Sequence, residues 1–187
     1  MVSGPGFVAW FTGLPGAGKS TVAALVGSQL EADGFLVDRL DGDELRARLW
    51  NDLGFSKEDR DTQVARIAWI ASRVARAGGI VLVSAISPYA EARDDARRVV
   101  EEHAPFIEIF VSTPLEECIR RDSKGHYARA LAGEIDTFTG ISAPYERPTN
   151  PDLVVDTATV DARVAADLVV AGLRELSLLS TVDGAIQ

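Results

Sequence analysis

The chain has 187 residues, of which 47% are hydrophobic and 25% charged, a composition typical of one globular domain rather than of a disordered or fibrous protein. Its net charge of −9 argues against general binding to nucleic acid or to an anionic membrane surface. No apolar run is long enough to span a bilayer, no signal-peptide pattern opens the chain, and the single cysteine, Cys118, cannot form an internal disulfide, so we expect a cytoplasmic protein.

Short apolar runs alternate with helical patterns along the chain. The apolar runs predict strands at 7–12, 35–40, 79–85, 106–111 and 153–155, and the helical periodicity predicts helices at 20–33, 62–77, 91–102, 114–121 and 160–176. This alternation implies a three-layer α/β fold, with helices on both faces of a five-stranded, mainly parallel sheet. Ligands in such folds bind at the edge where the strands end.

The segment from about 122 to 150 interrupts the alternation. It contains glycines, prolines and charges but no long helix or strand, and Tyr127, Phe138 and Tyr145 argue against simple disorder. A loop of this length inside a compact domain is typically functional, so we predict a mobile lid. We expect residues 1–187 to form a single domain with a C-terminal tail at about 180–187.

Residues 13–20 read Gly-Leu-Pro-Gly-Ala-Gly-Lys-Ser, which matches the P-loop pattern in full, with an apolar strand before it and a helix after it. The glycines let backbone N–H groups point at phosphate, and the helix N-terminus adds partial positive charge. We expect Lys19 to bridge the β- and γ-phosphates of a nucleoside triphosphate and Ser20 to ligate Mg²⁺. The alternative is a glycine-rich turn that matches by chance.

The turn after the second strand reads Leu-Asp-Gly-Asp-Glu-Leu-Arg at 40–46. In a functional interpretation, Asp43 accepts the proton of a substrate hydroxyl and Arg46 holds an acceptor anion. In a structural interpretation, Asp43 is only the N-cap of a helix, and the residue types do not separate the two. Many P-loop enzymes have an Asp after the third strand to help hold Mg²⁺, but this chain has Ser84, so Asp41, Asp43 or water must take that place.

Ser87 lies beyond the third strand, either near the phosphates or as an N-cap before Pro88. Ser56 and Asp59 loosely match a capping box, and Arg60 beside them is a candidate anion contact. The single helical charges Arg66, Arg73 and Arg76 are typical of a solvated helix face, and His126 in the lid is a candidate ligand contact.

Taken together, these segments resemble the adenylylsulfate kinase (APS kinase) family over nearly the whole chain. The resemblance is carried by GLPGAGKST (13–21), LDGDELR (40–46), LGFSKEDR (53–60), VSAISPYAEAR (83–93), IFVSTPLEECIRRDSKG (109–125) and FTGISAPYERPTNPDLVVDT (138–157). It implies that ATP phosphorylates the 3′-hydroxyl of adenosine 5′-phosphosulfate (APS), giving 3′-phosphoadenosine 5′-phosphosulfate (PAPS) and ADP in sulfate assimilation. It also implies Mg²⁺ as cofactor and a homodimer.

The resemblance assigns site residues as well. Lys19, Asp43 and Ser87 are implied to be catalytic, with Ser87 at the family's phosphoserine position, although direct in-line transfer needs no covalent intermediate. Phe55 and Phe138 are implied to sandwich the substrate adenine, Arg120 and Thr157 to belong to the ATP adenine site, and Lys124 to be the lid lysine. ATP is implied to contact Gly13, Leu14, Pro15, Gly16, Ala17, Gly18, Lys19, Ser20, Thr21, Arg120 and Thr157. APS is implied to contact Asp41, Asp43, Arg46, Phe55, Arg60, Gln63, Ile86, Ser87, Pro88, Lys124 and Phe138.

The chain departs from the family pattern in the helix after Arg60 and in the lid. Gln63 stands where the family has Asn, Ala65 replaces an Arg, and Ser123 and His126 stand where Pro and Leu are usual. Two other functions remain open at this point. One is a P-loop kinase for another small hydroxyl acceptor such as a sugar acid, and the other is a nucleotide-binding module without turnover.

Overall fold

A computed structural model describes residues 6–179, so the predicted tail at 180–187 lies outside the described residues. Five strands form one sheet in the order β2-β3-β1-β4-β5, and every pairing is parallel. The strands are β1 (Phe7–Thr12), β2 (Val37–Asp41), β3 (Ile80–Ser84), β4 (Phe106–Val111) and β5 (Leu153–Val155). The predicted α/β fold is confirmed, with β1, β4 and β5 at the predicted bounds.

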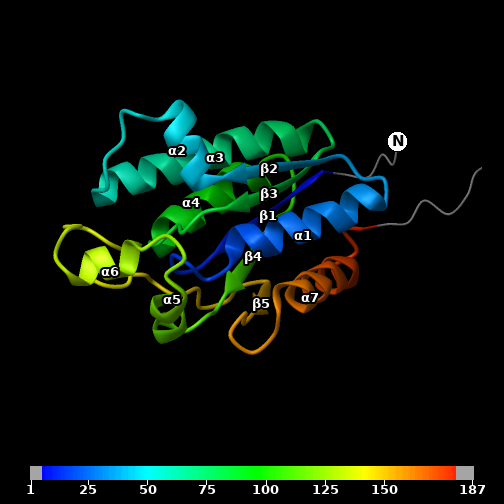
Figure 1. Cartoon of the computed structure of the whole chain (residues 1–187). Helices are drawn as coiled ribbons and strands as arrows, with labels where there is room; N and C mark the ends of the chain where they lie inside the picture. The colour runs from blue at the N-terminus through cyan, green and yellow to red at the C-terminus, as the bar shows by residue number, and fades with distance from the viewer. Residues whose placement is uncertain (1–5, 180–187) are drawn as a thin grey trace, which may run out of the picture.

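Helices cover both faces of the sheet, as Figure 1 shows. One layer holds α1 (Lys19–Ala32) and α7 (Ala162–Glu175), and the other holds α3 (Lys57–Arg76) and α4 (Ala90–Glu101). Successive β1 side chains point to opposite faces, so Phe7 and Phe11 pack in the α1–α7 core while Val8 and Trp10 pack in the α3–α4 core. Both cores therefore meet at β1.

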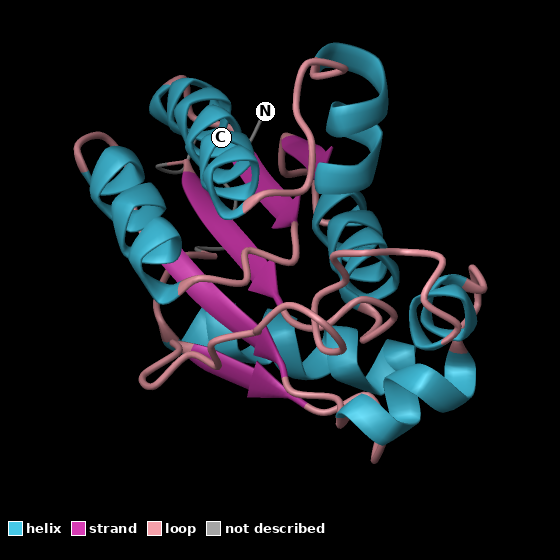
Figure 2. Ribbon diagram, turned by 90° about the vertical axis from the view of Figure 1, so that its left-hand side faces the viewer, coloured by secondary structure: helices cyan, strands magenta, loops and turns pink. Residues whose placement is uncertain are grey.

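Three shorter helices lie toward the carboxyl edge of the sheet, which faces the viewer in Figure 2. They are α2 (Gly42–Leu49), α5 (Leu115–Arg121) and α6 (His126–Leu131). The short helix α6 lies inside the predicted lid, which otherwise consists of turns and extended chain. Within the described part of the chain, no helix is both long and apolar enough to cross a bilayer.

Two helix caps differ from the predicted ones. Asp41, not Asp43, is the N-cap of α2, and its carboxylate accepts from the backbone N–H groups of Asp43 and Glu44. The N-cap of α4 is Tyr89 rather than Ser87. In contrast, the capping box of Ser56 and Asp59 is confirmed, and it starts α3 five residues earlier than predicted.

Two leucines of α7 test how this helix packs against the sheet. Leu173 on α7 is fully buried, whereas Leu168 on the same helix is 53% exposed. We expect Leu173→Ala to lower the free energy of unfolding by about 3 kcal/mol, because it leaves a cavity between α7 and the sheet. Leu168→Ala should lower it by less than about 1 kcal/mol. Urea unfolding followed by circular dichroism measures both, and equal losses would contradict this packing.

Candidate active site

The P-loop leaves β1 and enters α1 through left-handed backbone conformations. Gly16 has φ 72° and Gly18 has φ 100°, which only glycine adopts at little cost. The Lys19 ammonium folds back over the loop, where it donates to the carbonyl oxygens of Gly13 at 2.9 Å and Leu14 at 2.8 Å. The loop is thus shaped as a cradle around a single buried cation.

Lys19 is only 8% exposed, and this burial strongly affects its charge state. Desolvation lowers the pKa of the ammonium to about 8, although the negative charges of Asp43 and Asp41 act in the opposite direction. A polyphosphate placed here would favour the charged form. Nucleotide binding and protonation of Lys19 are therefore linked.

Ser20 follows Lys19 and is exposed at the mouth of the loop. Its hydroxyl donates to Asp41 Oδ2 at 2.6 Å, while Asp41 Oδ1 caps α2. The two residues come from neighbouring regions of the site, Ser20 from α1 and Asp41 from the end of β2. Of the two acidic residues in this turn, Asp41 is therefore the one beside the predicted metal ligand.

Asp43 lies one residue into α2 and faces the lid. Its Oδ2 accepts from the Lys124 ammonium at 2.7 Å, so an ion pair joins α2 to the lid. Desolvation raises the pKa of Asp43, but the hydrogen bond and charge of Lys124, with the charge of Lys19, outweigh it and hold that pKa below its ordinary value. Asp43 is thus a carboxylate at neutral pH, within electrostatic range of Lys19.

Arg46, Gln63 and Phe55 form a second cluster beside this turn. Arg46 donates to the carbonyls of Leu53 and Gly54 and to the side-chain oxygen of Gln63, and its guanidinium lies 4.8 Å from the Phe55 ring centroid. Gln63 in turn donates to the Gly42 carbonyl at 2.6 Å. The structure thus brings together three residues that were predicted to bind the substrate. Phe55 itself is 61% exposed.

Arg60 connects this cluster to the lid. Only 8% of it is exposed, and it donates to the Phe55 carbonyl at 2.9 Å, to the Thr137 carbonyl at 3.1 Å and to the Thr139 hydroxyl. The adjacent Phe138 packs edge-on against Tyr127, with ring centroids 4.9 Å apart. Arg60 thereby holds the backbones of the two predicted adenine-binding segments to one another.

The loop after β3 contains three further predicted residues, Ile86, Ser87 and Pro88. Ser87 is only 2% exposed, and its hydroxyl accepts a hydrogen bond from the Trp10 indole at 3.0 Å. The Ile86 carbonyl accepts from the Thr12 hydroxyl at 2.7 Å. In this conformation the Ser87 hydroxyl is enclosed. The sequence did not predict Trp10 as its partner, because Trp10 lies 77 residues away.

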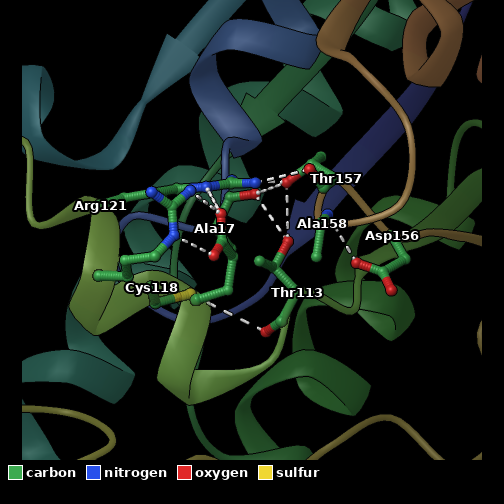
Figure 3. Close-up of polar contacts among 9 residues, drawn as sticks. Ala17, Thr113, Cys118, Arg121, Asp156, Thr157 and Ala158 are labelled. Carbon is green, nitrogen blue, oxygen red and sulfur yellow. Dashed lines mark hydrogen bonds and ion pairs between the residues drawn. The ribbon is translucent and has the colours of Figure 1, made fainter.

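The predicted ATP adenine site joins the P-loop to the loops after β4 and β5 (Figure 3). The hydroxyls of Thr113 and Thr157 both donate to the Ala17 carbonyl, at 3.0 and 2.8 Å. Arg121 donates to the Thr157 hydroxyl at 2.8 Å and to its carbonyl at 2.6 Å. Arg120, which was predicted for this site, is an exposed residue bound to Glu117. Its neighbour Arg121 makes the contacts with Thr157, and a contact of Arg120 with the ATP adenine stays a prediction.

Three further P-loop positions, Leu14, Pro15 and Thr21, differ in their surroundings. Leu14 is buried in the α1–α7 core, the Pro15 carbonyl accepts from the Tyr127 hydroxyl at 2.9 Å, and Thr21 is exposed on the first turn of α1. Tyr127 thus attaches the lid helix α6 to the P-loop. Among residues 6–179, no group of three or more His, Cys, Asp or Glu side chains forms a metal site.

The family model described as adenylylsulphate kinase matches residues 5–156. A probable adenylyl-sulfate kinase from Pseudomonas aeruginosa is 55% identical over 157 residues, which cover 84% of this chain and 72% of that protein. An adenylyl-sulfate kinase from Halothermothrix orenii is 51% identical over 170 residues, covering 91% of this chain and 90% of that protein.

The fold of this chain is also similar to a solved structure, that of the Mycobacterium tuberculosis APS kinase CysC in complex with AMPPNP and APS. The TM-score is 0.88 at 47% sequence identity, and the alignment covers 91% of this chain and 98% of that one.

The depressed pKa of Lys19 predicts how nucleotide affinity depends on pH. Below about pH 7 Lys19 is charged in the free protein, so its titration should not change the affinity for a non-hydrolysable ATP analogue there. Above about pH 8 affinity should fall by up to about tenfold per pH unit, because binding must then take up a proton. Calorimetry in two buffers of different ionisation enthalpy measures both affinity and proton uptake.

Variants of two lysines test whether Lys19 is the source of this pH dependence. Lys57 is exposed and ion-paired with Asp61, so Lys57→Ala should keep the wild-type pH profile. Lys19→Ala should bind the analogue weakly, with no proton uptake. An affinity that stays constant from about pH 7 to about pH 10 in the wild type would contradict the assignment.

Proposed function

The chain belongs to the adenylylsulphate kinase family, and we propose that it transfers the γ-phosphoryl group of ATP to the 3′-hydroxyl of APS, giving PAPS and ADP. The observation that carries this proposal is the meeting of a P-loop lysine, a carboxylate and a lid lysine at one sheet edge. Asp43 lies in range of Lys19 and is bound to Lys124 at 2.7 Å. Phosphoryl transfer needs such a carboxylate beside the phosphate cradle, to orient the attacking hydroxyl.

Lys19 and Asp43 have distinct tasks in the proposed reaction. Lys19 exchanges the carbonyl oxygens of Gly13 and Leu14 for phosphate oxygens, which neutralises charge as the terminal group departs. Asp43, released from Lys124 by the substrate, accepts the hydrogen bond of the 3′-hydroxyl. Because its pKa is low, Asp43 positions this hydroxyl early and takes its proton only late, as a loose transition state allows.

The chemistry of the acceptor matches the cluster around Phe55. APS presents an adenine ring and two adjacent anionic groups, and the cluster offers an exposed aromatic face with the guanidinium of Arg46 over it and Arg60 nearby. A sugar acid, the acceptor of the competing hypothesis, needs no aromatic face. We therefore favour a nucleotide acceptor held by Phe55, Phe138 and the guanidinium groups.

Mg²⁺ fits the oxygen donors at the mouth of the P-loop. Mg²⁺ is bound in phosphotransferases by one or two protein oxygens together with substrate phosphates and water, and Ser20 and its partner Asp41 supply a hydroxyl and a carboxylate there. The ion would neutralise charge on the β- and γ-phosphates. We propose Ser20 as its ligand and Asp41 as the acidic group that assists, since Asp41 is the carboxylate that contacts the Ser20 hydroxyl. A homodimer and a cytoplasmic location remain predictions.

A coupled assay of ADP release tests the reaction. With ATP and Mg²⁺, ADP should form at least about tenfold faster when APS is added. Asp43→Asn should lower turnover by about 10²-fold or more while the affinity for an ATP analogue stays within about threefold, because the P-loop is untouched.

Glu44→Gln is the matched control, since Glu44 is the next residue of α2 and pairs with the exposed Arg48. It should retain wild-type turnover. ADP release that does not respond to APS would refute the proposed acceptor, and wild-type turnover in Asp43→Asn would remove Asp43 from its role.

The metal assignment has its own test in Asp41→Asn. Asn caps helices as well as Asp does, so the variant removes a charge but keeps the cap of α2 and the melting temperature. We expect the Mg²⁺ concentration for half-maximal rate to rise by about fivefold or more, and calorimetric Mg²⁺ binding to the protein–ATP analogue complex to weaken equally. An unchanged Mg²⁺ dependence would show that water, not Asp41, completes the shell.

A further inference from the structure

Arg93 on α4 is a buried cation that the proposed reaction does not use. Only 4% of it is exposed. Its Nε donates to Glu108 Oε1 at 2.8 Å, its Nη1 to the Ser87 carbonyl at 2.7 Å and its Nη2 to the Glu146 carbonyl at 2.8 Å. One planar guanidinium therefore joins β4, the loop after β3 and the end of the lid.

Ser87, one of these partners, is held in an unfavourable backbone conformation. Ser87 has φ 46°, in the left-handed region that is unfavourable for a non-glycine residue. Two buried hydrogen bonds hold it there, one from the Trp10 indole to its hydroxyl and one from Arg93 to its carbonyl. This conformation sets the direction in which Ile86 and Pro88 leave the sheet edge.

The end of the lid is attached to the same loop. The Glu146 N–H donates to the Pro88 carbonyl at 2.8 Å, and the Ala90 N–H donates to the Glu146 carboxylate at 2.7 Å. The neighbouring Tyr145 ring lies 5.9 Å from the Arg93 guanidinium, and its hydroxyl bonds with Thr12 at 2.9 Å. Residues 86–90 and 145–146 thus form one bonded unit, and Arg93 is the group that contacts both halves.

The charge of Arg93 makes this unit a rigid one. Its partner Glu108 is also largely buried, with a side chain 12% exposed; burial raises the pKa of Glu108, and Arg93 opposes that rise. Breaking one side of a buried ion pair is costly, so the guanidinium stays in place. Lysine could keep the pair with Glu108, but a single ammonium lacks the fork that reaches both carbonyls at once.

We propose that Arg93 is a positioning residue for the acceptor: it holds residues 86–88 and the lid end at Glu146 in the arrangement that receives APS. This inference rests on the acceptor site proposed above. Arg93 touches neither the P-loop nor Lys19 in the described contacts, so its loss acts on the acceptor and spares the nucleotide. A purely structural role would instead weaken both ligands together.

The test compares Arg93→Lys and Arg93→Ala with wild type, using calorimetric binding of APS and, separately, of a non-hydrolysable ATP analogue. We expect the Kd for APS to rise by about 10- to 100-fold in both variants, because a displacement of about 1 Å at a binding site has effects of this size. The Kd for the ATP analogue should change by less than about threefold. Guanidinium chloride at about 10 mM, far below denaturing concentrations, should restore part of the APS affinity of Arg93→Ala.

A second measurement reports on Ser87 without any ligand. The indole N–H of Trp10 donates to the Ser87 hydroxyl, so its ¹⁵N–¹H resonance should shift in the folded Arg93→Lys variant. Arg98→Ala is the matched control: Arg98 is exposed on the same helix and pairs with Asp95, so both Kd values and the Trp10 resonance should match the wild type.

The outcomes separate this inference from the proposed function. If wild type itself does not bind APS, the proposed function fails. If wild type binds APS and the folded Arg93→Lys variant binds it equally well, the positioning role is overturned. Equal losses for APS and the ATP analogue in Arg93→Lys would overturn it too, since they would assign Arg93 to the stability of the whole domain.

Discussion

β1 is enclosed on every side, and the loop that leaves it depends on that confinement. All six residues of Phe7–Thr12 are buried, β3 and β4 pair with its two edges, and helices cover its two faces. Gly13 follows so close to the Val111 carbonyl that an added Cβ would approach it to 2.6 Å. Backbone N–H groups can serve as a phosphate cradle only when the backbone itself is held in this way. The packing of two cores against one strand is therefore the first requirement of the site.

Charges at the site are paired before any substrate arrives. Lys19 is bound to two carbonyls, Asp41 to Ser20 and the α2 backbone, and Asp43 to Lys124. In a protein of net charge −9, an anionic substrate meets cations that already have partners. Binding therefore exchanges one set of partners for another, and only the difference between the two sets contributes to affinity. In the reaction proposed above, this exchange frees the Asp43 carboxylate when the acceptor binds Lys124.

Sequence reasoning was most successful where the signal is local. Strand bounds at β1, β4 and β5 follow from short, mainly apolar runs, and the P-loop follows from residues adjacent in the chain. Caps were less accurate, because Asp41 and Asp43 are chemically equal and only the backbone at the end of β2 decides between them. The contacts of Trp10, Arg93 and Arg121 were missed, since their partners lie up to 77 residues away and no spacing rule connects them.

Arginine is abundant in this chain, 16 residues against three lysines, and the structure gives a physical reason for part of this bias. Arg60, Arg93 and Arg121 each donate to a backbone carbonyl and to at least one further group, so a planar fork joins segments that a lysine would contact singly. Carbonyl acceptors carry no residue identity, which is why these contacts leave no sequence pattern. Arg60 shows the consequence. Three of its five N–H donors hold Phe55 and the lid at Thr137 and Thr139, so a substrate anion that binds the remaining donors binds a guanidinium whose position the lid fixes. Acceptor affinity and lid position are therefore parts of one equilibrium.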